Sequence, residues 1–139
     1  MKKNILKIDG LFLAIMGTLA GITDLVSYFS GKGPFGPVYF QNSIAIGGFE
    51  AHCLAIVAGI ILVAKSKSPD AIFFNKTAIA IHTVLGISNL IWFKVFLDTN
   101  TIPMGYITTI AHFAFIFLNT IAVYEKNILR IKCDRQNTN

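Results

Sequence analysis

The sequence has few charged residues, and this shortage excludes a small soluble domain. Only 14% of the 139 residues are Asp, Glu, Lys or Arg, whereas soluble domains carry about a quarter. Hydrophobic residues make up 54% of the chain, and its mean hydropathy is +0.63. We therefore interpret the chain as an integral membrane protein.

The motifs of several enzyme and metal-binding classes are also missing. The chain has only two cysteines, with no Cys-x-x-Cys pair and no zinc-ligand spacing. It has no Gly-x-Ser-x-Gly nucleophile elbow and no glycine-rich phosphate loop, so no motif indicates hydrolytic or nucleotide chemistry. Cys53 lies in an apolar stretch and Cys133 in a polar tail, and we do not expect them to form a disulfide.

Four apolar stretches are long enough to cross a bilayer. A hydrocarbon core about 30 Å thick requires roughly 20 residues of helix. Polar turns separate the stretches, and the first connection, residues 31–43, is rich in glycine and proline. We predict an all-α protein, an up-down-up-down four-helix transmembrane bundle. Its expected spans are residues 9–30, 43–64, 74–97 and 102–124, followed by a polar tail over residues 125–139.

The first span is expected to be retained rather than cleaved as a signal peptide. Lys2 and Lys3 precede an apolar run, as they do in signal peptides. However, Asp9 interrupts the start of that run, and the apolar residues continue to Phe29.

The positive charges predict how the bundle is oriented. Ten of the 12 Lys and Arg residues fall on the side of the two chain termini, and only Lys32 and Lys94 fall on the other side. Cytoplasmic loops of membrane proteins carry the excess of positive charge, so we expect both termini in the cytoplasm. The net charge of +5 then reflects topology and contact with membrane lipid headgroups, not nucleic-acid binding.

Small residues define one face of the first span. Gly10, Ala14, Gly17, Gly21 and Asp24 recur at intervals of three and four and form one helical stripe. Its Gly17–Gly21 pair has the GxxxG spacing that allows two helices to approach closely. Because such a stripe faces protein rather than lipid, we expect Asp24 to point into the bundle.

The third and fourth spans share a pattern in which an asparagine follows a histidine by seven positions. His82 and Asn89 belong to HTVLGISN, and His112 and Asn119 belong to HFAFIFLN. If the two spans are antiparallel, His82 lies level with Asn119, and Asn89 lies level with His112. We predict two His–Asn rungs, and we interpret the inner rung, His82 with Asn119, as a structural hydrogen bond.

Four polar side chains are expected at one depth, roughly 10 Å below the outer surface. They are Asp24, Glu50, Asn89 and His112, one from each span. His52 lies near this depth but about 200° around its helix from Glu50. We expect Glu50 to face inward, because exposing a carboxylate to lipid is the worse alternative.

This layer predicts a pocket for a small ligand that opens to the extracytoplasmic side. Two carboxylates at one depth repel each other, and packing alone does not require such a pair. The carboxylates would supply negative charge or exchange protons, and the aromatic segment 31–43 would act as a lid. The predicted ligand-binding residues are Asp24, Glu50, His52, Asn89 and His112.

Other functions stay open at this point. A metal could bind to Asp24, Glu50 and His112, and a b-type haem to His52 and His112, but no ligand spacing supports either, so we assign no metal ligand and no cofactor. A non-catalytic subunit could dock a larger membrane complex through its small-residue faces, one of which contains Gly59. A transporter would need a homo-oligomer, because four spans leave little room for alternating access.

The first two spans resemble those of the DoxX-like group of small four-span membrane proteins. The similarity rests on the first span (GTLAGITDL), a long loop and a second span reading GGFEAHCLAIVAGIILV, in which Glu50 and Gly59 are the matching positions. Asp24 and the His–Asn pairs depart from the group's pattern. The resemblance implies a bacterial inner-membrane protein, linked in some members to quinone-dependent redox complexes. His112 and a carboxylate would then be proton donors to a quinone carbonyl.

Overall fold

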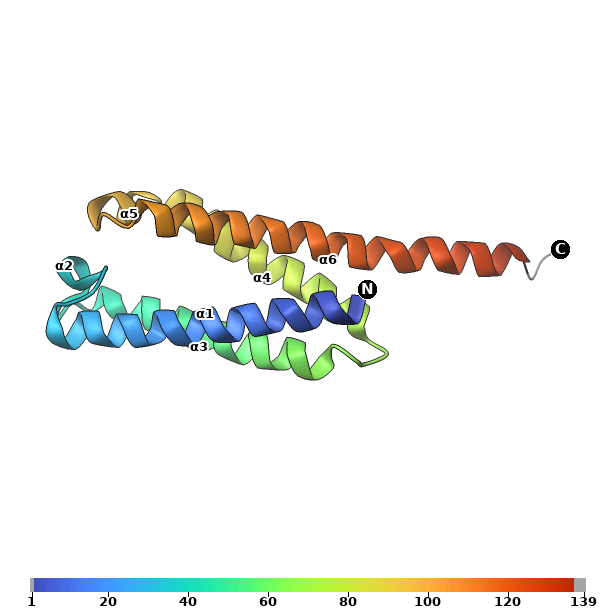
Figure 1. Cartoon of the computed structure of the whole chain (residues 1–139), viewed down its shortest axis with the longest axis horizontal. Helices are drawn as coiled ribbons and strands as arrows, with labels where there is room; N and C mark the ends of the chain where they lie inside the picture. The colour runs from blue at the N-terminus through green and yellow to red at the C-terminus, as the bar shows by residue number, and fades with distance from the viewer. Residues whose placement is uncertain (1, 137–139) are drawn as a thin grey trace.

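The computed structural model describes the backbone of residues 2–136 and the side chains of residues 4–125. Within these limits every regular element is a helix. Four helices are long and apolar enough to cross a membrane: α1 (Lys2–Ser30), α3 (Ile44–Lys65), α4 (Ala71–Ile91) and α6 (Ile102–Gln136). Two short helices, α2 (Gly36–Tyr39) and α5 (Lys94–Asp98), lie in two of the connections (Figure 1). The prediction of an all-helical protein with four candidate membrane spans is confirmed.

Three of the helices have ends that differ from the predicted spans. α1 begins at Lys2, before the predicted start at residue 9. α4 runs from Ala71 to Ile91, whereas the predicted span covered residues 74–97. The helix stops at Trp92, and α5 follows as a separate turn of helix. Apolar residues continue through this interruption, so composition alone does not reveal it. α6 continues past the predicted start of the tail to Gln136, and residues 137–139 of that tail lie outside the described residues.

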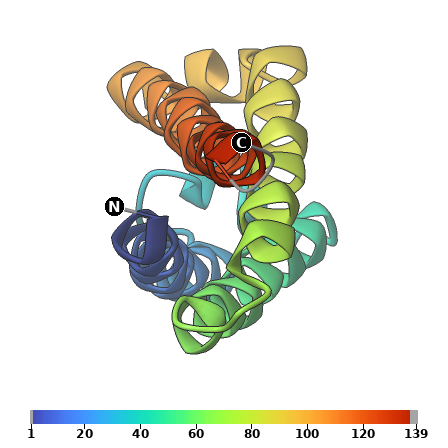
Figure 2. The same ribbon diagram turned by 90° about the vertical axis from the view of Figure 1, so that its right-hand side faces the viewer.

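The long helices form two pairs, α1 with α3 and α4 with α6 (Figure 1). Both pairs are antiparallel, because residues early in one helix lie against residues late in its partner. Gly10 lies against Gly59, and Gly17 lies against His52. In the second pair, Gly86 lies against His112. Seen from the end that carries the N-terminus, the two pairs lie on opposite sides of the molecule (Figure 2).

Glycine residues allow α1 and α3 to approach until their backbones touch. A Cβ atom added at Gly10 would lie 2.6 Å from the carbonyl oxygen of Gly59, and one added at Gly59 would lie 2.5 Å from the carbonyl oxygen of Gly10. Small residues have this role in membranes because lipid gives apolar surfaces little reason to associate. The predicted small-residue faces are therefore used within the chain, and they are not free to dock a larger complex.

The apolar core is small and lies in the half of the molecule nearer the N-terminus of α1. It joins α1, α3 and α4 through the buried side chains of Leu6, Leu13, Leu62 and Ala78. In each candidate span, at most 33% of the residues in the apolar segment are buried. The remaining apolar side chains form an outer surface of the kind that lipid covers in a multi-pass membrane protein.

Replacing Gly59 with alanine is expected to lower the free energy of unfolding by about 1 to 3 kcal/mol, because the new methyl group would overlap the α1 backbone. Thermal unfolding of the purified protein in detergent measures this change. Gly47→Ala is the matched control, since a Cβ atom at Gly47 would have no other atom within 4 Å. Alanine is the better helix former, so this control should keep or slightly raise stability. Equal losses in the two variants would contradict the backbone contact.

Candidate functional site

Two groups of polar side chains contain the buried aspartates. The first, the Asp24 cluster, consists of Asp24, Ser27 and His52 and lies toward the end that carries α2. The second, the Asp9 network, consists of Asp9, His82, His112 and Asn119 and lies between the two helix pairs.

Asp24 has one satisfied and one unsatisfied carboxylate oxygen. Its side chain is 1% exposed, and Oδ2 lies 2.5 Å from Nδ1 of His52 on α3. Oδ1 is buried and has no hydrogen-bond partner in the described part of the chain. The buried hydroxyl of Ser27, one turn further along α1, also has no partner there. Buried polar atoms nearly always have a partner, and these two are among the few exceptions in the described residues.

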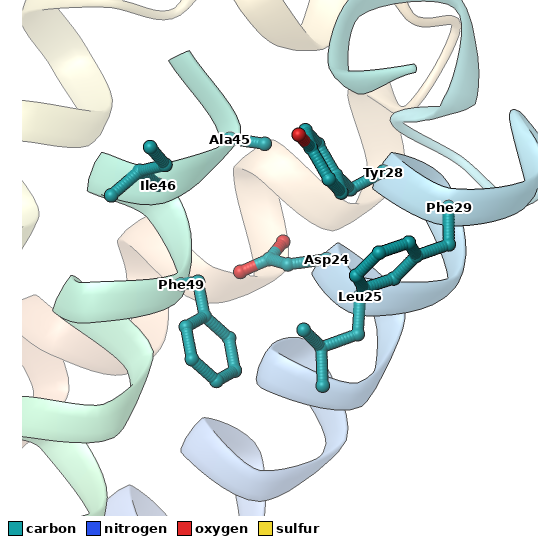
Figure 3. Close-up of a pocket in the computed structure, with 7 residues that line it drawn as sticks. All are labelled: Asp24, Leu25, Tyr28, Phe29, Ala45, Ile46 and Phe49. Carbon is teal, nitrogen blue, oxygen red and sulfur yellow. The ribbon is translucent and has the colours of Figure 1, made fainter. Parts of the chain in front are cut away.

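A groove of about 220 Å³ lies beside Asp24, between α1 and α3 (Figure 3). The carboxylate points from α1 toward α3, and it is the only charged group in the lining. The rest of the lining is aliphatic or aromatic and comes from both helices. It consists of Leu25, Tyr28, Phe29, Ala45, Ile46 and Phe49.

The segment between α1 and α3 folds back over this end of the helix pair. The ring of Phe35 stacks on that of Tyr39, with the ring centroids 5.3 Å apart, and the backbone N–H of Gln41 donates to the carbonyl of Tyr28 at 3.1 Å. Burial raises the pKa of Tyr39, and the negative charge of Asp24 raises it further. The Tyr39 phenol therefore stays protonated at neutral pH and is a hydrogen-bond donor near the Asp24 cluster.

The Asp9 network joins three helices through one carboxylate. Oδ1 of Asp9 on α1 is hydrogen-bonded to Nε2 of His82 on α4 at 2.6 Å. Oδ2 accepts a hydrogen bond from Nδ2 of Asn119 on α6 at 2.5 Å. Nδ1 of His82 lies 2.8 Å from Nδ1 of His112. Asp9, His82 and Asn119 are fully buried, and both oxygens of the carboxylate have partners, as an ionisable group within a membrane requires.

Glu50 is exposed, so the expectation that it faces the interior is wrong. The contact between Gly10 and Gly59 fixes which side of α3 meets α1. His52 lies on that side and reaches Asp24. Because Glu50 is about 200° away around the helix, it points in the opposite direction.

The residues expected in one layer do not form one hydrogen-bonded site. Asp24 is paired with His52, Asn89 donates to the Thr108 hydroxyl at 3.1 Å, and His112 is bonded to His82. The structure thus places Asp24 and His52 together, while His112 belongs to the other group.

The two predicted His–Asn rungs do not form. Asp9 lies between the members of the inner rung, and in the outer rung Asn89 is bonded to Thr108 and His112 to His82. His82 and Asn119 each bind Asp9, and their bonds to this carboxylate replace the predicted bond between them. Asp9 escaped prediction because it lies at the expected start of the first span, where a charge at the membrane border costs little. The signal that identifies it is its position on the same helical stripe as Leu6 and Leu13, both of which are buried.

The metal-binding alternative would bring Asp24, Glu50 and His112 together, and the structure separates them. Glu50 is exposed, and His112 is bonded to His82. In the part of the chain that the structure describes, no three His, Cys, Asp or Glu side chains are arranged to hold a metal ion. His52 and His112, the pair considered for haem, belong to different groups of polar residues.

Compared with known protein families, curated proteins and solved structures, the chain matches none. The resemblance of its first two spans to the DoxX-like group stays a prediction.

Replacing Asn119 with alanine is expected to lower the free energy of unfolding by about 1.5 to 3 kcal/mol, because it removes a hydrogen bond to a buried carboxylate. Asn89→Ala removes only a bond to a hydroxyl group, and hydrogen bonds between membrane helices average about 0.6 kcal/mol. Unfolding of the two variants in the same detergent measures both losses. A larger loss for Asn89→Ala would show that the Asp9 network is not the main polar contact.

Proposed function

We propose that the protein binds a small amphiphilic molecule in the groove beside Asp24. Two observations support this proposal: Asp24 lines the groove, and its Oδ1 atom is buried without a hydrogen-bond partner in the described residues. Leaving such an atom unpaired costs about 1 to 3 kcal/mol. A ligand that donates a hydrogen bond to it removes that cost, and water would do so without using the apolar walls.

The lining favours a ligand with an apolar body and one hydroxyl or amino group. Tyr28, Phe29 and Phe49 offer aromatic surfaces to the body (Figure 3), and Asp24 accepts a hydrogen bond from the polar group. His52 is 33% exposed and is paired with the other oxygen of Asp24, which holds the carboxylate in place beside the groove. The reduced headgroup of a quinone, a ring that carries hydroxyl groups, combines these features, and the DoxX-like resemblance favours the same class.

We infer the orientation from the charges. Ten of the 12 Lys and Arg residues lie toward the end opposite the groove, and positive residues favour the cytoplasmic side. Consecutive spans then run up, down, up and down across a bacterial inner membrane, with both chain termini in the cytoplasm. The groove lies in the extracytoplasmic half of the bilayer, where a ligand dissolved in lipid reaches it laterally between α1 and α3.

Labelling of single cysteines tests this orientation. With Cys53 and Cys133 replaced by serine, Lys32→Cys should react with a membrane-impermeant maleimide in intact cells, and Lys67→Cys should react only after the membrane is permeabilised. Lys32 and Lys67 are both exposed, so burial does not account for a difference between them. If only Lys67→Cys reacted in intact cells, both chain termini would lie outside the cytoplasm, and the proposed orientation would be wrong.

The effect of Asp24→Asn on quinol binding tests the site. Addition of a short-chain benzoquinol to the detergent-solubilised protein should raise its thermal unfolding temperature, because the ligand binds only the folded state. Asp24→Asn should weaken the binding about 10- to 100-fold, since it removes a charge-assisted hydrogen bond.

Glu50→Gln is the matched control, because it neutralises an exposed carboxylate on the adjoining helix and should bind the quinol as the unmodified protein does. Binding that is equal in all three proteins would contradict a role for Asp24. Native mass spectrometry of the unmodified protein reports which molecule co-purifies, together with the number of subunits. If an amphiphile of another class co-purified, the groove would be a binding site for that class and not for a quinol.

A further inference from the structure

The Asp9 network is a chain of hydrogen bonds with one accessible end. Asp9 and His82 are fully buried, whereas His112 is half-buried. The chain runs from Asp9 through both ring nitrogens of His82 to Nδ1 of His112, with distances of 2.6 and 2.8 Å. Within the described residues, Nε2 of His112 has no hydrogen-bond partner. This nitrogen is therefore the end of the chain at which a proton can be added.

Asn119 shows that the Asp9 carboxylate is a hydrogen-bond acceptor in this network. Its Nδ2 atom donates both to Oδ2 of Asp9 and, at 2.9 Å, to the backbone carbonyl of Phe115. The Phe115 carbonyl can only accept, so it fixes the orientation of the amide, and Oδ2 of Asp9 must then be an acceptor. An ionised Asp9 then accepts the Nε2 proton of His82 at Oδ1. His82 in turn accepts the Nδ1 proton of His112, because one nitrogen of the facing pair must donate and the other must accept.

We propose that the Asp9 network is a binding site for one exchangeable proton, which enters at Nε2 of His112 and leaves its positive charge on His82, beside Asp9. When a proton binds this Nε2 atom, the Nδ1–H bond of His112 breaks, and a new N–H bond forms at Nδ1 of His82. His112 is again neutral, and His82 is an imidazolium ion beside the Asp9 carboxylate. The network gains one proton, and its net charge changes from negative to zero.

The surroundings favour this loaded state, because a neutral buried group costs less than a single buried charge. The only cationic partner of Asp9 among the described residues is His82. The other ionisable side chains of α1, α3, α4 and α6 in this range do not neutralise it: the lysines are exposed, and Asp24 is paired with His52. These other groups are Lys7, Asp24, Tyr28, Glu50, His52, Cys53, Lys65, Lys76, Tyr106, Tyr124 and Glu125.

Aromatic rings cover His82, which leaves His112 as the residue through which a proton enters the network. The ring of Phe115 stacks on His82, with centroids 5.1 Å apart and an angle of 16° between the ring planes. The ring of Phe12 lies 6.4 Å from His82 and 4.9 Å from Phe115. These rings cover His82 with apolar surface, so a proton reaches it through His112. The site involves none of the groove residues, and its test is independent of the ligand.

Nitrogen NMR of the full chain tests the proposal directly. The protein contains three histidines, so protein labelled with ¹⁵N in the histidine rings and reconstituted in lipid nanodiscs gives few signals. We expect a scalar coupling between the Nδ1 atoms of His82 and His112, which arises only across an N–H···N hydrogen bond. We also expect one uptake step between about pH 5 and 8 in which both rings change together.

Two aspartate variants of α1 complete the test. Asp9→Asn removes the charge that balances the imidazolium ion, so the shared step should move to lower pH by about 1 to 3 units. Asp24→Asn is the matched control, and it should change only the His52 signals.

The proposal is overturned if the two rings of the unmodified protein titrate separately, or if both stay neutral over this pH range. Since these outcomes need no variant, they decide the question even if Asp9→Asn does not fold.

Discussion

A carboxylate within a bilayer needs partners, and through Asp9 this requirement determines how the two helix pairs meet. Within the α1–α3 pair, small residues bring the backbones close together. Between the pairs, the helices make far fewer contacts, and lipid gives apolar faces little reason to associate. The bonds from Asp9 to His82 and Asn119 cross this boundary. The relative position of the pairs thus depends on hydrogen bonds, which act only at short range and in particular directions.

The rotation of α1 about its axis explains why its two aspartates have different partners. Asp9 and Gly10 are neighbours in sequence and point about 100° apart on the helix. When Gly10 lies against α3, Asp9 is directed toward α4 and α6. Asp24 lies further along the glycine side of the helix, and it therefore meets α3 through His52. The close backbone contact with α3 thus sets the partners of both carboxylates.

Length, hydropathy and the glycine stripe were sufficient to predict the four spans and the burial of Asp24, because each depends on the properties of one helix. The choice between Glu50 and His52 needed a fact about two helices, namely that the Gly59 side of α3 contacts α1. The cost of exposing a carboxylate to lipid favoured an inward-facing Glu50. The close contact of Gly59 with α1 instead determines how α3 is rotated about its own axis. The role of Asp9 was harder to predict, since counting along antiparallel spans gives depth and does not show which helix enters between His82 and Asn119.

The two groups combine aspartate with histidine, yet they are suited to different ligands. In the Asp9 network both carboxylate oxygens and both nitrogens of His82 have partners, so a molecule that entered would have to break existing bonds. A proton is the exception, because it binds at one end and moves along the bonds already present. Asp24 has one unpaired oxygen and lines a groove of about 220 Å³, which leaves room for heavier atoms. Whether both oxygens of the aspartate carboxylate have partners thus separates a site for protons from a site for molecules.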